Sequence, residues 1–218
     1  MPRPPRPERL LIAGPAGALE ALVETPEGSG ARGFGVVCHP HPLHGGTLDN
    51  KVVHTLARAL HDAGMPTLRF NFRGVGASGG QFADGIGETD DALSVVAFGR
   101  TRWPGKEPWL LGFSFGAVVA IRAAVPAGAQ RLVTVAPAVS RVAAGHATPL
   151  CPWLLIQGDA DEVIDAGAVL DWASRQTPPP KVHVLREAGH FFHGRLPELR
   201  EAVVEFAEEG GARGAPPS

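Results

Sequence analysis

The sequence predicts an α/β fold, in which helices cover both faces of one mostly parallel sheet of eight strands. Short apolar segments rich in Val, Leu and Phe alternate with longer segments whose apolar residues recur at helical spacing. Such alternation is typical of βαβ units, whose strands lie parallel and are buried on both sides. The length of 218 residues suits one domain, and 44% apolar with 19% charged residues is a globular composition.

Eight segments have the composition of strands, and five have the periodicity of helices. The expected strands are residues 10–13, 18–25, 35–39, 67–72, 109–112, 131–135, 153–157 and 182–186. The expected helices are residues 50–63, 90–100, 115–124, 166–175 and 197–208. The turn sequence GPAG joins the first two strands, so we expect them to form an antiparallel hairpin.

The expected helix starts carry capping signals. At the first helix, Asp49 or Asn50 is expected to accept hydrogen bonds from the free amides of the first turn. Thr89 is the expected cap of the second helix. Pro197 suits the first turn of the last helix, where a missing N–H leaves no donor unpaired.

The chain ends and the charge narrow the class of protein. Residues 1–8 and 210–218 are rich in Pro, Gly, Ala or Arg, so we expect flexible tails around a single domain at 9–209. We find no secretory signal and no apolar segment near the ~20 residues that span a bilayer. The net charge of −2 gives no basic surface for nucleic acid. Cys38 and Cys151 indicate buried thiols rather than a disulfide, as in a reducing compartment. From these observations together we expect a cytoplasmic protein that binds neither membrane nor nucleic acid.

The strongest local motif is the pentapeptide Gly112-Phe113-Ser114-Phe115-Gly116, which has the form G-x-S-x-G. It follows a predicted strand and precedes a predicted helix, which is the context of a nucleophile elbow. The glycines are required there because the backbone folds closely onto itself. A tight turn with a structural serine is the alternative, but the strand–turn–helix context favours Ser114 as a nucleophile.

A serine hydroxyl is a weak nucleophile at neutral pH, so it needs a general base and a carboxylate that orients the base. Asp159 and Asp161 both follow the predicted strand at 153–157. Asp159 is suited to closing the turn, which favours Asp161 as the acid without excluding Asp159. Glu162 and Asp165 are expected to be solvated or to cap a helix.

The candidate base is His190, in the loop after the last predicted strand. His183 lies within that strand, and His193 is suited to a surface position or to a contact behind the site. We expect His190 to take the proton of Ser114, because the serine and the acid already require a histidine at this end of the sheet.

Acyl transfer also needs two donors for the oxygen that becomes negative. The amide of Phe115, directly after the serine, is one. The second is expected in the turn after the third strand, where Pro40 and Pro42 lack an N–H and leave His41, Leu43 or a later amide. From the loops around the serine we expect five side chains to line a substrate pocket: His39, Leu43, His44, Phe113 and Phe191.

Two other readings of these loops are disfavoured. Four histidines lie close in sequence (His39, His41, His44 and His54), but their spacing matches no recognised zinc motif, and we expect neither a metal nor a cofactor. The glycine-rich segment at 69–78 has neither G-x-G-x-x-G nor a P-loop lysine. We expect Asn71 and Arg73 to brace the loop that carries the second donor.

Together these motifs resemble the small, lidless bacterial α/β-hydrolases that are described as carboxylesterases and are similar in build to dienelactone hydrolases. The resemblance covers residues 8–208 and is carried by the segments at 39–51, 71–78, 112–116, 158–161 and 189–192. Dienelactone hydrolases use a cysteine nucleophile, whereas this chain has Ser114. The resemblance therefore supports the fold and ester chemistry, but it does not imply that this chain acts on the substrate of the dienelactone hydrolases.

The resemblance implies an α/β-hydrolase fold with no large lid, because residues 137–150 leave little room for an inserted one. The family's G-x-x-D spacing selects Asp161, and its H-G-x-P turn selects the His41 amide. The expected function is hydrolysis of small or short-acyl carboxylic esters through an acyl-enzyme. A thioesterase, peptidase or acyltransferase would use the same triad, and a non-catalytic binding protein is the alternative of a different class.

Overall fold

A computed structural model describes residues 7–28, 30, 33–142 and 146–209. The strands are β1 (Glu8–Gly14), β2 (Gly17–Glu24), β3 (Gly33–Cys38), β4 (Thr67–Phe70), β5 (Glu107–Phe113), β6 (Arg131–Val135), β7 (Trp153–Gly158) and β8 (Lys181–Leu185). The helices are α1 (Lys51–Asp62), α2 (Ile86–Arg102), α3 (Phe115–Ala124), α4 (Ala166–Ser174) and α5 (Leu196–Glu208), with 3-10 turns η1 (Pro42–His44) and η2 (Val139–Arg141). The tails expected at 1–8 and 210–218 lie almost wholly outside the described residues, and β1 begins at Glu8.

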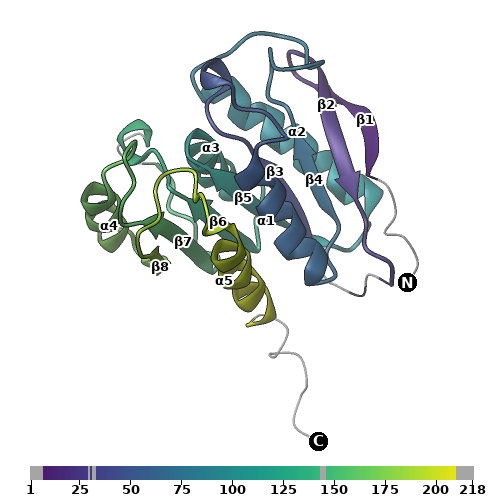
Figure 1. The fold of residues 1–218 in the computed structure, drawn as a ribbon. Helices are drawn as coiled ribbons and strands as arrows, with labels where there is room; N and C mark the ends of the chain where they lie inside the picture. Colours follow the sequence, from purple (N-terminus) through teal and green to yellow (C-terminus); the bar gives the residue numbers. More distant parts are fainter. Residues whose placement is uncertain (1–6, 29, 31–32, 143–145, 210–218) are drawn as a thin grey trace, which may run out of the picture.

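One eight-stranded sheet runs through the molecule in the order β1-β2-β4-β3-β5-β6-β7-β8 (Figure 1). The strands from β4 to β8 in this order are parallel, while β1 pairs antiparallel with β2, and β2 with β4. The predicted mostly parallel sheet and the entry hairpin are therefore confirmed. Because the six parallel strands point the same way, the loops that follow them meet at one edge of the sheet.

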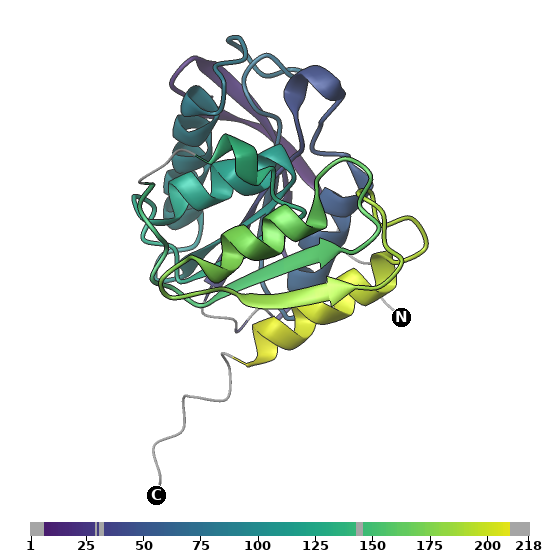
Figure 2. The ribbon, with the colours of Figure 1, turned by 90° about the vertical axis from the view of Figure 1, so that its left-hand side faces the viewer.

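Helices cover both faces of the sheet, as predicted. α1 packs against α5 on one face, while α2 packs against α3 on the other. Figure 2 shows α4 and α5 on opposite sides of β7 and β8. Successive strand residues alternate between the two cores: Leu110 lies in the α2–α3 core, and Leu111 lies in the α1–α5 core. This period of two is the reason that the central strands are apolar throughout.

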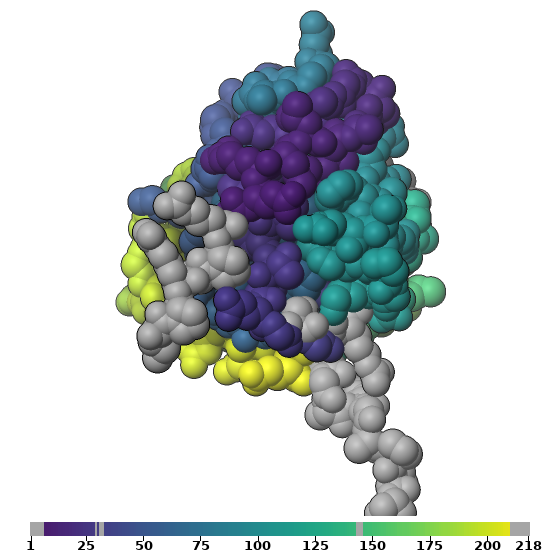
Figure 3. Space-filling model, turned by 90° about the vertical axis from the view of Figure 1, so that its right-hand side faces the viewer, coloured from purple at the N-terminus to yellow at the C-terminus, as the bar shows by residue number. Residues whose placement is uncertain are grey.

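The β1–β2 hairpin forms the edge of the sheet opposite β8, and α2 lies beside it (Figure 3). Arg102 at the end of α2 forms an ion pair of 3.3 Å with Glu8 at the start of β1. No described helix is both long and apolar enough to cross a bilayer.

The helix starts follow the sequence with one exception. Asn50 caps α1, because its Oδ1 accepts from the amides of Val52 and Val53 at 2.9 and 3.4 Å. The prediction that Thr89 caps the second helix is wrong. α2 begins four residues earlier than expected, at Ile86, because the carboxylate of Glu88 accepts from the amide of Gly85 at 2.7 Å.

Candidate active site

Ser114 lies in a strained turn between β5 and α3, with φ 56° and ψ −115°. A Cβ at Gly112 would lie 2.2 Å from the carbonyl oxygen of Gly116, and a Cβ at Gly116 would lie 2.3 Å from that of Cys38. Neither position can therefore carry a side chain, which is the physical reason for the G-x-S-x-G spacing. A backbone conformation of this kind costs about 1–3 kcal/mol and persists only where its surroundings hold it. The amide of Ser114 donates to the carbonyl of Val135 at 2.9 Å, which ties the turn to the end of β6.

Three side chains from three loops form one hydrogen-bonded chain. His190 Nε2 lies 3.1 Å from Ser114 Oγ, and His190 Nδ1 lies 2.9 Å from Asp161 Oδ2. The side chains of His190 and Asp161 are 4% and 0% exposed. Because an ionised carboxylate can only accept, Nδ1 carries the proton and Nε2 offers its lone pair to the serine hydroxyl. The loops after β5, β7 and β8 thus bring together the residues that the sequence predicts as nucleophile, acid and base.

Asp161, and not Asp159, reaches the histidine. Four donors surround its carboxylate: His190 Nδ1, Gln157 Nε2 at 3.0 Å, and the amides of Val163 and Ile164 at 2.9 and 2.8 Å. Burial raises the pKa of Asp161, but the hydrogen bonds from His190, Ile164 and Val163 outweigh it, so its pKa lies below the usual value.

Asp159 has a different role, as the turn interpretation expects. Its Oδ1 accepts from the amide of Glu187 at 2.6 Å, which closes the loop at the end of β8. Asp165 caps α4, since its Oδ1 accepts from the amide of Ala168 at 3.1 Å. This agrees with the predicted capping role.

Sequence reasoning missed two supporting residues. Gln157 donates to Asp161, and its own Oε1 is buried with no partner among the described residues. Glu162 is exposed, as the solvated alternative expects, and in addition its Oε2 accepts the backbone N–H of His190 at 3.0 Å. This hydrogen bond holds the pKa of Glu162 below its usual value. Only the position of Glu162 beside Asp161 hints at this contact in the sequence.

In the described part of the chain, the backbone amides of Phe115 and His41 have no acceptor. Phe115 is the first residue of α3, so its N–H lies at the positive end of the helix dipole. The rings of His41 and Phe115 are in contact, with centroids 4.9 Å apart. The loop after β3 therefore lies against the elbow with a free donor on each side, which suits an oxyanion.

His39 holds this loop in place rather than lining a pocket. Its side chain is fully buried, and its Nε2 accepts the amide of Phe72 at 3.0 Å while Nδ1 donates to the carbonyl of Pro40 at 2.7 Å. With both ring nitrogens occupied, His39 has no atom to offer a substrate, so the predicted pocket role does not fit. Burial lowers the pKa of His39 to about 4, which keeps the imidazole neutral.

Leu48, later in the same loop, is braced at both backbone groups. Asn71 Oδ1 accepts its N–H at 2.8 Å, and Arg69 Nη1 donates to its carbonyl at 2.8 Å. The predicted bracing by Asn71 is confirmed. That by Arg73 is wrong, because Arg73 forms an ion pair of 2.7 Å with the buried Asp91 of α2.

The other predicted pocket residues fall into two groups. Phe113 and Phe191 flank His190, with ring centroids 5.0 and 5.1 Å from the imidazole. Leu43 and His44 are exposed in η1, where the His44 ring stacks on that of His41. Among the residues that the structure describes, no three His, Cys, Asp or Glu side chains are grouped to hold a metal ion. In the same part of the chain, neither His183 nor His193 forms a hydrogen bond with Ser114.

Comparison with known proteins places the chain among hydrolases. A family model described as "Serine aminopeptidase, S33" matches residues 41–150. A protein of Rickettsia prowazekii (strain Madrid E) is 32% identical over 209 residues, which are 91% of this chain and 87% of the relative.

Two solved structures are more similar still. An α/β serine hydrolase homologue from Coxiella burnetii is 43% identical and has a TM-score of 0.88, over 94% of this chain and 99% of the other. An α/β serine hydrolase without lid from Xanthomonas campestris is 39% identical and has a TM-score of 0.89, over 98% and 99% of the two chains. The predicted fold and the resemblance to lidless bacterial hydrolases are confirmed, and the chain belongs to the α/β serine hydrolases.

Proposed function

We propose that this serine hydrolase cleaves carboxylic esters, with Ser114 as nucleophile, His190 as general base and acid, and Asp161 as the carboxylate that orients His190. The observation that carries the proposal is the hydrogen-bonded chain from Asp161 through His190 to Ser114 Oγ. This arrangement fixes the tautomer that accepts the serine proton.

In the acylation step, Ser114 Oγ bonds to the ester carbonyl carbon as its proton passes to His190 Nε2. Asp161 stabilises the imidazolium, while the amides of Phe115 and His41 donate to the negative oxygen. The bond to the alcohol oxygen then breaks, and that oxygen takes the proton from Nε2. Water attacks the acyl-enzyme with His190 as base, and the acid leaves Ser114 as it was.

Peptide cleavage is the second candidate, because the matching family model is described as a serine aminopeptidase. An aminopeptidase must bind the free ammonium of its substrate, for which a carboxylate is the usual partner. Two carboxylates adjoin the base, and both Asp161 and Glu162 already accept hydrogen bonds from His190. Asp161 is buried among four donors, so the exposed Glu162 is the carboxylate of the two that a substrate ammonium could meet, and aminoacyl anilides test this candidate.

A serine-directed fluorophosphonate probe and a series of p-nitrophenyl esters test the proposal. We expect an adduct on Ser114, a preference for short acyl chains, and loss of at least 10³-fold in kcat with Ser114→Ala. Asp161→Asn should lower kcat by about 10⁴-fold, while its matched control Asp159→Asn retains activity. Ester turnover that survives Ser114→Ala would refute the mechanism. If aminoacyl anilides or thioesters are cleaved faster than the esters, they replace esters as the proposed substrate class. If the acyl group is transferred to added alcohols, the protein is an acyltransferase instead.

A further inference from the structure

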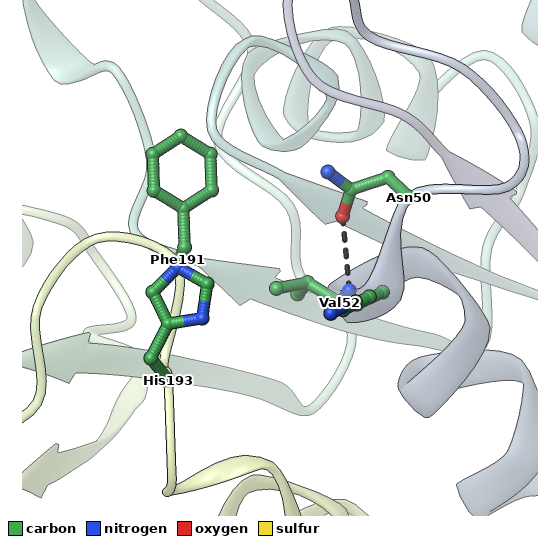
Figure 4. A pocket seen from close by; sticks show the side chains of 5 residues that line it. Asn50, Val52, Phe191 and His193 are labelled. Carbon is green, nitrogen blue, oxygen red and sulfur yellow. Dashed lines mark hydrogen bonds between the residues drawn. The ribbon is translucent and has the colours of Figure 1, made fainter.

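A cavity of about 290 Å³ lies between the loop after His190 and the first turn of α1. Its walls are Asn50, Lys51 and Val52 on one side, and Phe191 and His193 on the other. Figure 4 shows Phe191 and His193 on the histidine loop facing Asn50 and Val52 at the start of the helix. Neither the fold nor the proposed mechanism gives this cavity a role.

The cavity adjoins the base. Phe191 directly follows His190, and its ring meets the imidazole edge-on, at 85° and 5.1 Å between centroids. The same ring contacts Phe113, the residue before the nucleophile, at 6.1 Å. During acylation, His190 Nε2 gives its proton to the leaving oxygen, so that oxygen must lie within hydrogen-bond reach of His190. The alcohol part of the ester therefore leaves on the side of the site where Phe191 stands.

The walls indicate which alcohol fits. Phe191 is 41% exposed although it is a large aromatic residue, and the His193 ring lies 6.0 Å from it. On the opposite wall Lys51 is exposed, Val52 is almost wholly buried, and the Asn50 side-chain carbonyl is occupied in capping α1. The exposed rings of Phe191 and His193 suit an aromatic group, which packs edge-to-face or offset on them. The volume of about 290 Å³ is just below the roughly 300 Å³ at which ligand pockets begin, and it leaves room for one ring.

We propose that this cavity binds the alcohol part of the substrate, that this alcohol is aromatic, and that Phe191 determines the preference for it. The inference rests on the proposed ester hydrolysis. It assigns the leaving group to the His190 side of the site, and leaves the acyl group to the side of His41 and Phe115.

The test compares benzyl acetate with ethyl acetate, which share the acyl group and differ in the alcohol. The ratio of kcat/KM for the two esters is measured for the wild type and for Phe191→Ala, so that intrinsic reactivity cancels. We expect the benzyl-to-ethyl ratio to fall about tenfold, a usual effect of removing one wall of an apolar pocket. Phe191→Tyr retains the ring and should keep the ratio within about twofold.

A second variant, His193→Ala, removes the other exposed ring without touching the imidazole of His190. It should lower the same ratio in the same direction, by a smaller factor. An equal loss on both esters in Phe191→Ala would show that Phe191 acts only through His190 and would overturn the inference. The inference would also be overturned if Phe191→Ala changed the preference among esters that share one alcohol and differ in the acyl group. Ester turnover independent of Ser114 in the same assay would instead refute the underlying mechanism.

Discussion

At the scale of single residues, two neighbouring carboxylates, those of Asp161 and Glu162, both hold His190 in position. Asp161 accepts from the ring Nδ1 of His190, and Glu162 accepts from its backbone N–H. A Cβ at Gly189 would lie 2.7 Å from Glu162 Oε2, so the glycine before His190 leaves room for this contact. Ring and backbone of His190 are thus fixed from the same loop, which limits its drift from Ser114.

Glu162 is therefore expected to be a positioning residue. Glu162→Ala removes the acceptor for the His190 amide and should lower kcat about tenfold with little change in KM, because the base is less well placed. Glu162→Gln keeps a carbonyl acceptor and should retain most of the activity. Steady-state kinetics on one short ester checks both variants. Equal losses in the two variants, or a loss confined to KM, would contradict this role.

The sequence was sufficient to predict that Ser114 and His190 meet, because each has a motif and a place after a strand. It could not separate Asp159 from Asp161, since both lie in one loop and only the fold shows which carboxylate reaches the ring. The roles of His39 and Glu162 depend on backbone amides from distant segments, those of Phe72 and His190. No local pattern encodes such contacts.

At the scale of elements, the start of α2 shows where local signals mislead. Gly85 lies directly before the helix and Gly87 lies in its first turn, and both lower helix propensity and favour a later start. The buried Glu88 overrides this, because its carboxylate accepts the amides of Ala83 and Gly85 at 2.8 and 2.7 Å. A cap formed by a side chain inside the helix is harder to recognise than one formed by a residue in front of it.

Glu88→Ala should destabilise the protein by about 1–3 kcal/mol, since the buried amide of Gly85 and the partly buried amide of Ala83 lose their acceptor. Thr89→Ala is the matched control, because Thr89 Oγ1 donates only to the carbonyl of Gly85, at 2.6 Å. It should cost about 1 kcal/mol or less. Urea unfolding at neutral pH measures both. A larger effect of Thr89→Ala would restore Thr89 as the important residue at this end of the helix.

At the scale of the whole molecule, alternating segments were enough to predict eight strands and two helical layers. The order of the strands was not predictable, because the central strands are buried on both faces and their compositions are alike. The sheet places β3 between β4 and β5, so the loop of His39 lies between the elbow and the segment of Asn71. The buried side chains of His39 and Asn71 form hydrogen bonds between these loops, so they contribute to the free energy of unfolding of the whole protein.

The pH dependence of unfolding should report His39. Its pKa is lowered to about 4 in the folded protein from 6.5, so the unfolded chain takes up a proton first as the pH falls. The stability that neutral His39 supplies is complete above pH 6.5 and is lost between pH 6.5 and about 4. This amounts to about 3 kcal/mol.

His39→Gln keeps an acceptor for the Phe72 amide and does not titrate. Between pH 7 and pH 4, the free energy of unfolding should therefore fall less in this variant than in the wild type. The difference between the two decreases should be about 3 kcal/mol. Denaturant titrations at several pH values measure the difference. Parallel curves for the two proteins would mean that His39 is not held neutral by burial.

The positive φ of Ser114 decides which nucleophiles this elbow admits, before any question of reactivity. Threonine has the same hydroxyl and serves as a nucleophile in other enzymes. A β-branched residue is nevertheless a rare outlier at φ 56°, so threonine is barred on conformational grounds. Cysteine, with a single heavy atom on Cβ, meets no such barrier. The turn would therefore tolerate cysteine in place of Ser114, whereas threonine would require the turn to be rebuilt.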